Sequence, residues 1–138
     1  MHLMENDVIF AYLNELDPYH GVSEKIFQRL AQGKLELRIS SVTLVEMELI
    51  YRSQHVEDRL LLHLSAIAAL PNVQYLPLNP ETVITSVYLR QNHGLSFFDS
   101  HYAAAALNAN IPILSFDQAY DRVPGLRRIK PENINAIK

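Results

Sequence analysis

The sequence contains no cysteine. This absence excludes a disulfide framework and a thiolate metal site, so any bound metal must be held by oxygen atoms or by imidazole. No apolar run approaches the roughly 20 residues that a membrane span requires, and the N-terminus lacks a basic stretch followed by a hydrophobic core. We therefore expect a cytoplasmic protein with no membrane partner.

Positive charge is also scarce. The chain has 12 Lys and Arg residues against 15 Asp and Glu residues, which gives a formal net charge of −3. Proteins that bind nucleic acid through bulk charge normally carry an excess of Lys and Arg, so this balance argues against that mode of binding. The only dense basic cluster comprises Arg122, Arg127, Arg128 and Lys130. Binding of phosphates would have to rely on this cluster and on bound divalent cations.

The length and composition indicate one domain. The chain has 138 residues, of which 49% are hydrophobic and 20% are charged, and these values are ordinary for a globular protein. No linker, repeat or low-complexity tract divides the sequence. We expect one hydrophobic core and one functional site.

Stretches with strand-like spacing of apolar residues alternate with helix-like stretches. Strands are expected at residues 2–5, 35–39, 73–76 and 111–115, with a short edge strand within 123–129. Helices are expected at about 22–33, 43–53, 57–70, 80–92 and 100–108, whereas 8–13 is compatible with a strand or with a buried helix. The alternation predicts an α/β fold, a three-layer α/β/α sandwich around a central, mostly parallel sheet.

Several polar residues are placed to begin helices. Residues 43–46 and 96–99 both have the spacing of a capping box, in which the first and last side chains satisfy free backbone amides. Asn6 or Asp7 would cap a helix if residues 8–13 are helical.

Acidic residues stand at the predicted junctions between strands and helices. Glu5 or Asp7 follows the first expected strand, and Glu46 follows the second. Asp117 follows the strand expected at residues 111–115. Asp99 lies at the start of the alanine-rich helix. In parallel α/β sheets, ligands bind beyond the carboxyl ends of the strands. We therefore expect these carboxylates to converge in one cleft.

The segments that carry these acids resemble, in order, the four acidic motifs of the PIN-domain family. They are residues 5–13, 40–46, 94–99 and 114–117, and residues 17–20 resemble the segment that often follows the first motif. Each motif is short, but together they cover nearly the whole chain with suitable spacing.

The resemblance implies a single PIN-like domain spanning residues 1–138, whose acids bind Mg²⁺ or Mn²⁺ and hydrolyse RNA. The implied catalytic and metal-ligating residues are Glu5, Asp7, Glu46, Asp99 and Asp117. Many family members are VapC-like toxins of toxin–antitoxin pairs, which a small partner protein inhibits and which are often dimeric. On this basis we expect an RNA substrate, a small antitoxin partner and a homodimer.

The first motif departs from the family pattern. Its first acid is usually an aspartate, which Glu5 replaces, and Asp7 replaces a small polar residue. Residues two apart on a strand point the same way, so either carboxylate is a candidate for the metal.

The residue types suit a hard cation. Mg²⁺ prefers oxygen ligands, keeps several waters and commonly takes one or two protein carboxylates directly. We expect Asp99 and the first-motif acid to ligate directly, and Glu46 and Asp117 to act through water or a second ion. Ser115 or Asn6 would orient these groups.

The same residues are also compatible with different roles. Each acid can serve as an ordinary helix cap, and Glu5 in place of aspartate is consistent with a catalytically degenerate PIN domain that binds RNA or protein. A histidine metal site is disfavoured because no two of the six histidines have the four-residue spacing of a zincin. A nucleotide-binding protein is disfavoured because the chain has no P-loop and no glycine-rich turn after the first strand.

Overall fold

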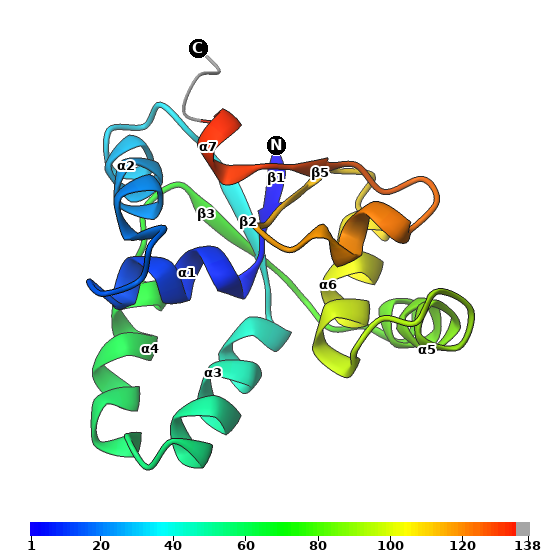
Figure 1. The fold of residues 1–138 in the computed structure, drawn as a ribbon, viewed down its shortest axis with the longest axis horizontal. Coiled ribbons are helices and arrows are strands. Elements are labelled where there is room, and N and C mark those ends of the chain that lie inside the picture. The colour runs from blue at the N-terminus through cyan, green and yellow to red at the C-terminus, as the bar shows by residue number, and fades with distance from the viewer. Residues whose placement is uncertain (135–138) are drawn as a thin grey trace.

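A five-stranded parallel sheet lies at the centre of the computed structural model, which describes residues 1–134 (Figure 1). The strand order is β3-β2-β1-β4-β5, and every neighbouring pair is parallel. The strands are β1 (His2–Met4), β2 (Leu37–Ser40), β3 (Val73–Leu76), β4 (Ile113–Leu114) and β5 (Arg128–Ile129). The expected central parallel sheet is thus confirmed.

Helices cover both faces of this sheet, which confirms the three-layer sandwich (Figure 1). The α-helices are α1 (Asn6–Leu13), α2 (His20–Ala31), α3 (Val42–Ser53), α4 (Leu60–Ala68), α5 (Pro80–His93), α6 (Phe97–Asn108) and α7 (Pro131–Ile134). Two 3₁₀ segments, η1 (Glu57–Arg59) and η2 (Gln118–Arg122), complete the described chain. Within residues 1–134, no helix is both long and apolar enough to cross a membrane.

The core consists of two layers of side chains, one on each face of the sheet. Met4 and Leu114 pack with helices α1, α2, α3 and α4, whereas their neighbours Leu3 and Ile113 pack with α5 and α6. This division follows from the alternation of side chains along a strand. Residues 103–106, all alanine, are buried in the second layer, where their small volume lets α6 approach the sheet closely.

The ambiguous segment at residues 8–13 is helical, because Glu5 caps it. The Glu5 carboxylate accepts a hydrogen bond from the Asp7 amide at 3.2 Å, so the first strand ends at Met4 and α1 begins at Asn6. The expectation that Asn6 or Asp7 would be the cap was wrong. Asp7 lies inside the first turn, and its side chain is directed to the loop after β4.

Only one of the two expected capping boxes contains a cap hydrogen bond. Ser96 does cap α6, and its hydroxyl oxygen accepts from the Asp99 amide at 3.3 Å. The prediction for 43–46 was wrong, because α3 begins at Val42 and Glu46 lies in its second turn. The carboxylate of Glu46 bonds side chains from distant segments instead.

Candidate active site

Five acidic side chains lie near the carboxyl ends of β1 and β4, where α1, α3 and α6 also begin. Glu5 follows β1, Asp7 is in the first turn of α1, and Asp117 follows β4. Glu46 comes from α3 and Asp99 from the first turn of α6. Strands that run in parallel bring their carboxyl ends to one edge, which explains how residues so far apart in sequence meet.

Ser115 connects three of the five acidic residues. Its buried Oγ lies 3.1 Å from Oε2 of Glu5 and 2.7 Å from Oδ2 of Asp7, and it accepts a bond from the Asp117 amide at 3.0 Å. A hydroxyl has one proton, so Ser115 donates to one of the two carboxylates at a time. The Phe116 amide donates to the same Oδ2 of Asp7 at 2.9 Å. The loop after β4 therefore fixes both first-motif acids.

Glu5 is the most buried of the five acids. Burial raises the pKa of its carboxyl well above the usual value, and the negative charges of Asp7, Asp99 and Glu46 raise that pKa further. Burial also raises the pKa of Asp7 to about 6, although hydrogen bonds from Ser115 and the Phe116 amide act to lower it. These shifts are consistent with a poorly hydrated environment around Glu5 and Asp7.

Glu46 is held by two side chains from other elements. Asn6 Nδ2 donates to Oε1 of Glu46 at 2.8 Å, and the hydroxyl of Tyr102 donates to the same oxygen at 2.9 Å. Asn6 and Tyr102 are both buried. Within the described residues, no hydrogen bond reaches Oε2 of Glu46, so that oxygen retains its full capacity to accept.

A second buried tyrosine contacts Asp99. The hydroxyl of Tyr120 donates to Oδ1 of Asp99 at 3.2 Å. Burial raises the pKa of Asp99, the charge of Asp117 raises it further, and the charge of Arg122 lowers it. Asp117 itself caps η2, since its Oδ1 accepts from the Ala119 amide at 2.8 Å.

The chemistry of this site suits a hard divalent cation. All of its candidate ligands are oxygen atoms, which Mg²⁺ prefers. Oδ1 of Asp7 and Oδ1 of Asn6 are buried and have no hydrogen-bond partner within residues 1–134. Across the same residues, however, no three histidine, aspartate or glutamate side chains already stand in a geometry that could hold a metal ion. The oxygen ligands therefore suit a cation. In this structure the carboxylates instead accept hydrogen bonds from Ser115, Asn6, Tyr102 and Tyr120.

The expectation that Glu5 and Asp7 point the same way on one strand was wrong. They do not share one face of a strand, because Glu5 ends β1 and Asp7 belongs to a helix. They meet because both carboxylates lie within hydrogen-bonding distance of Ser115.

The basic cluster is only partly available for phosphates. Arg128 makes a bidentate ion pair with Asp121 at 3.0 Å for both bonds, and it donates to the Ser115 carbonyl at 3.2 Å. This arginine supports the loop that carries Ser115 and Asp117. Arg122 is exposed and close enough to influence the pKa of Asp99.

Sequence reasoning missed Tyr102 and Tyr120. Each lies three residues after a motif acid, Asp99 or Asp117, on the stretch that the motif already marks. Three residues is nearly one helical turn, so this spacing was a usable signal for Tyr102 in α6. The spacing does not predict which carboxylate each tyrosine hydroxyl contacts.

Comparison with solved structures shows the same fold in toxin proteins. The chain is similar to VapBC2 from Rickettsia felis, solved bound to a DNA fragment from its promoter, with a TM-score of 0.73, 14% identity, and 93% of this chain and 96% of that chain covered. It is similar to VapC20 of Mycobacterium tuberculosis, described as a Sarcin-Ricin loop cleaving toxin, with a TM-score of 0.70, 17% identity and coverage of 88% and 93%. For DNA-bound VapBC from Salmonella typhimurium the TM-score is 0.71, the identity is 18%, and the coverage is 95% and 99%.

A search of curated proteins finds no match to this sequence. The family profile described as the PIN domain matches residues 7–126, a span that contains four of the five acids. With this match over most of its length, and with the sheet order and acidic edge described above, the chain belongs to the PIN domain family.

Proposed function

We propose that the protein is a divalent-metal-dependent endoribonuclease that hydrolyses RNA phosphodiester bonds in the cytoplasm, as the toxin of a toxin–antitoxin pair. Residues 1–138 would act as a single PIN-like domain. The observation that supports the proposal is that five acidic residues come from elements that begin or end near one edge of the sheet, with the carboxylates of Glu5 and Asp7 within hydrogen-bonding distance of Ser115. Membership of the PIN domain family supports it.

Each acid has a distinct role in this proposal. Asp99 and a first-motif acid, Asp7 or Glu5, would hold Mg²⁺ or Mn²⁺ directly, and Glu46 and Asp117 would hold it through water or at a second position. When bound, such an ion supplies an activated water for attack on phosphorus and stabilises the leaving oxygen.

Uncharged side chains keep these acids in place. Ser115 fixes the orientation of the first-motif carboxylates, and Tyr102 with Asn6 fixes Glu46. Burial of Glu5 and partial burial of Asp7 would limit the access of bulk water to these charges, which would strengthen their electrostatic effect.

The nuclease proposal is tested with purified protein and single-stranded RNA. We expect cleavage in Mn²⁺ or Mg²⁺, none in EDTA, and none from Asp99→Asn. Asp58→Asn is the matched control, because Asp58 is exposed in η1 and contacts none of the five acids. Equal cleavage by Asp99→Asn and Asp58→Asn would refute the assignment.

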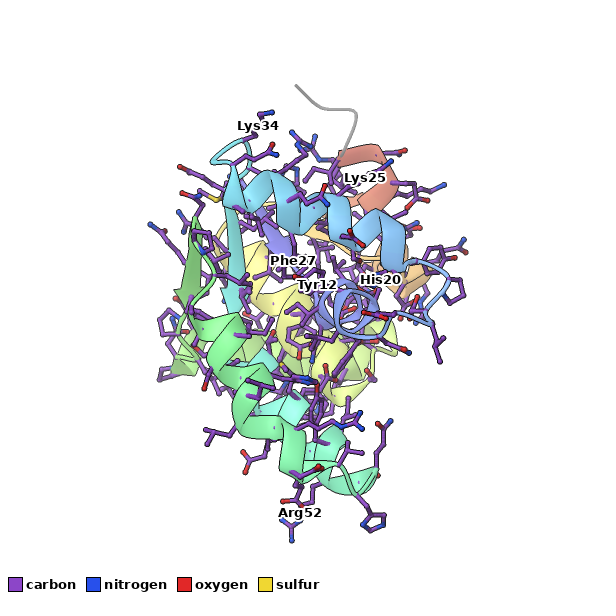
Figure 2. The ribbon with its side chains drawn as sticks, turned by 90° about the vertical axis from the view of Figure 1, so that its left-hand side faces the viewer. Tyr12, His20, Lys25, Phe27, Lys34 and Arg52 are labelled. Carbon is purple, nitrogen blue, oxygen red and sulfur yellow. The ribbon has the colours of Figure 1, made fainter. Side chains whose placement is uncertain are left out.

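An antitoxin partner is supported by the similar structures that are toxin–antitoxin complexes. A surface groove between α1 and α2 is the candidate site, and its lining includes Tyr12, His20 and Phe27 (Figure 2). The rings of Tyr12 and Phe27 stack with centroids 3.9 Å apart, which gives the groove an apolar floor. Co-purification with the product of an adjacent gene, lost in Gln28→Arg at an exposed position that lines the groove, would support this partner.

A homodimer is supported by apolar side chains on α5. Val83, Ile84, Val87 and Tyr88 are exposed on this helix, which lies at one side of the molecule (Figure 1). Contiguous apolar surface of this kind commonly marks a protein interface. Light scattering should give a dimer for the natural chain and a monomer for Ile84→Glu.

A degenerate PIN domain that binds RNA or protein is the second candidate function. Glu5 motivates it, because this residue replaces the usual aspartate and uses one oxygen to cap α1. Calorimetry separates the candidates: millimolar Mn²⁺ should bind to the nuclease, whereas a protein that binds no Mn²⁺ under these conditions would be the degenerate module.

A further inference from the structure

A partly exposed pair of aromatic side chains lies beside the acidic cluster. The ring of Tyr19, at the residue before α2, stacks on the ring of Phe116 with centroids 4.2 Å apart and an interplanar angle of 17°. Tyr19 is 49% exposed. Phe116 therefore covers one face of this ring, while much of the rest of Tyr19 remains open to solvent.

The backbone around Tyr19 is fixed on both sides. Its amide donates to Oδ1 of Asp17 at 2.8 Å, and the His20 amide donates to the Asp17 carbonyl at 3.0 Å. On the other side, the Tyr19 carbonyl accepts from the Ser23 amide at 3.1 Å. A ring held in this way loses little conformational entropy when a ligand binds, so it is preorganised for a flat partner.

Phe116 connects this pair directly to the acids. It lies between Ser115 and Asp117 in the sequence, and its amide donates to Oδ2 of Asp7 at 2.9 Å. A ligand that stacks on Tyr19 thus lies next to the segment that positions both Asp7 and Asp117.

We propose that Tyr19, supported by Phe116, stacks a base of an unpaired RNA nucleotide next to the phosphate that is cleaved. This inference rests on the proposed function, which makes RNA the substrate. Stacking on an aromatic side chain does not require positive charge, and it suits a chain whose net charge is −3 and whose Arg128 is already paired. The base must be free of its own neighbours to stack on protein, so this contact selects single-stranded or loop nucleotides.

A fluorescence experiment tests the stacking itself. The chain has no tryptophan, so Tyr19→Trp introduces a single indole. We expect a short oligoadenylate to quench its emission on mixing, and an abasic strand of the same length to leave it unchanged. Leu62→Trp is the control, because Leu62 is 71% exposed on α4 and is not part of the pair. Absence of quenching in Tyr19→Trp, or equal quenching in both variants, overturns the proposal.

Kinetics test the consequence for cleavage. Tyr19→Leu keeps an apolar contact with Phe116 but removes the ring, so KM for single-stranded RNA should rise about tenfold, with kcat much less affected. Tyr19→Phe should restore most of the loss, because the ring is what stacks. An unchanged KM in Tyr19→Leu contradicts the inference.

The two proposals fail in different ways. A natural chain that cleaves no RNA in Mn²⁺ contradicts the nuclease proposal, but quenching of Tyr19→Trp would still support a base-binding surface. A chain that cleaves RNA without quenching in Tyr19→Trp keeps the nuclease proposal and rejects the role of Tyr19.

Discussion

The hydroxyl of Tyr102 donates a 2.9 Å hydrogen bond to Oε1 of Glu46, across 56 positions of sequence. Tyr102 is fully buried, and Asn6 donates to the same oxygen. Bonds to a charged acceptor in a buried setting are stronger than bonds between neutral groups. This contact fixes one carboxylate of the cluster in α3 relative to α6.

Tyr102→Phe should weaken the candidate site without unfolding the chain. The ring stays in the core, and only the donor to Glu46 is lost, so we expect Mn²⁺ affinity and RNA cleavage to fall about tenfold. Tyr75→Phe is the matched control, because the Tyr75 hydroxyl donates to the Ile67 carbonyl and contacts none of the acids. Titration calorimetry and cleavage rates provide the measurements, and equal losses in the two variants would contradict a positioning role for Tyr102.

Ser115→Ala should lower stability as well as activity. The buried hydroxyl lies between Glu5 and Asp7 and accepts from the Asp117 amide, so its removal takes one hydrogen-bond partner from these groups. Loss of such a group costs about 1–3 kcal/mol of unfolding free energy. Ser23→Ala is the control, because Ser23 is equally buried but its Oγ has no hydrogen-bond partner within residues 1–134. Urea denaturation of both variants would refute the prediction if their midpoints were the same.

The convergence of the acids could be predicted because it depends on sheet direction. A parallel sheet brings every strand's carboxyl end to one edge, so Glu5 and Asp117, which follow β1 and β4, lie at the same edge. The register between them follows from the β1–β4 pairing of Met4 with Leu114. The position of the site therefore required only the order of strands and acids.

The partners of those acids could not be predicted, because tertiary contacts decide them. Residues 43–46 and 96–99 have the same local spacing, yet only the second segment contains a cap hydrogen bond. In α3 the carboxylate of Glu46 accepts hydrogen bonds from Asn6 and Tyr102. Local helix propensity does not predict these tertiary contacts. The helical state of residues 8–13 could not be predicted either, because the helix is capped by Glu5, which was expected to belong to the first strand.

Arg122→Gln should weaken RNA binding more than it slows chemistry. Arg122 is exposed and lowers the pKa of Asp99, which places its charge near the cluster, whereas Arg128 is paired with Asp121. We expect KM for RNA to rise several-fold and the slope of log affinity against log salt to fall by about one. Arg52→Gln is the control, because Arg52 is exposed in the last turn of α3, at the lower end of the molecule in Figure 2. An unchanged salt slope in Arg122→Gln would exclude a phosphate contact.

Without metal, the raised pKa values of the acids should make the protein less stable as pH rises from about 4 to about 6, whereas His2, whose pKa burial lowers to about 4, acts in the opposite direction. Burial raises the pKa of Asp7 to about 6, from a value near 3.8 in the unfolded chain, and burial also raises the pKa of Glu5 and of Asp99. In this pH range the folded state keeps protons that the unfolded state releases, so the unfolding free energy falls as pH increases. The contribution of Asp7 alone is roughly 2 kcal/mol.

Mn²⁺ should reverse this trend, because a cation binds the deprotonated carboxylates. Added Mn²⁺ should therefore raise the melting temperature more at pH 7 than at pH 4.5. Asp7→Asn removes the charge that burial disfavours, so in EDTA at pH 7 it should melt at a higher temperature than the natural chain while gaining less from Mn²⁺. Asp121→Asn is the contrasting variant, since pairing with Arg128 lowers the pKa of Asp121 and its loss should not stabilise the fold. If Asp7→Asn melted no higher than the natural chain in EDTA at pH 7, burial would not be what raises the pKa of Asp7.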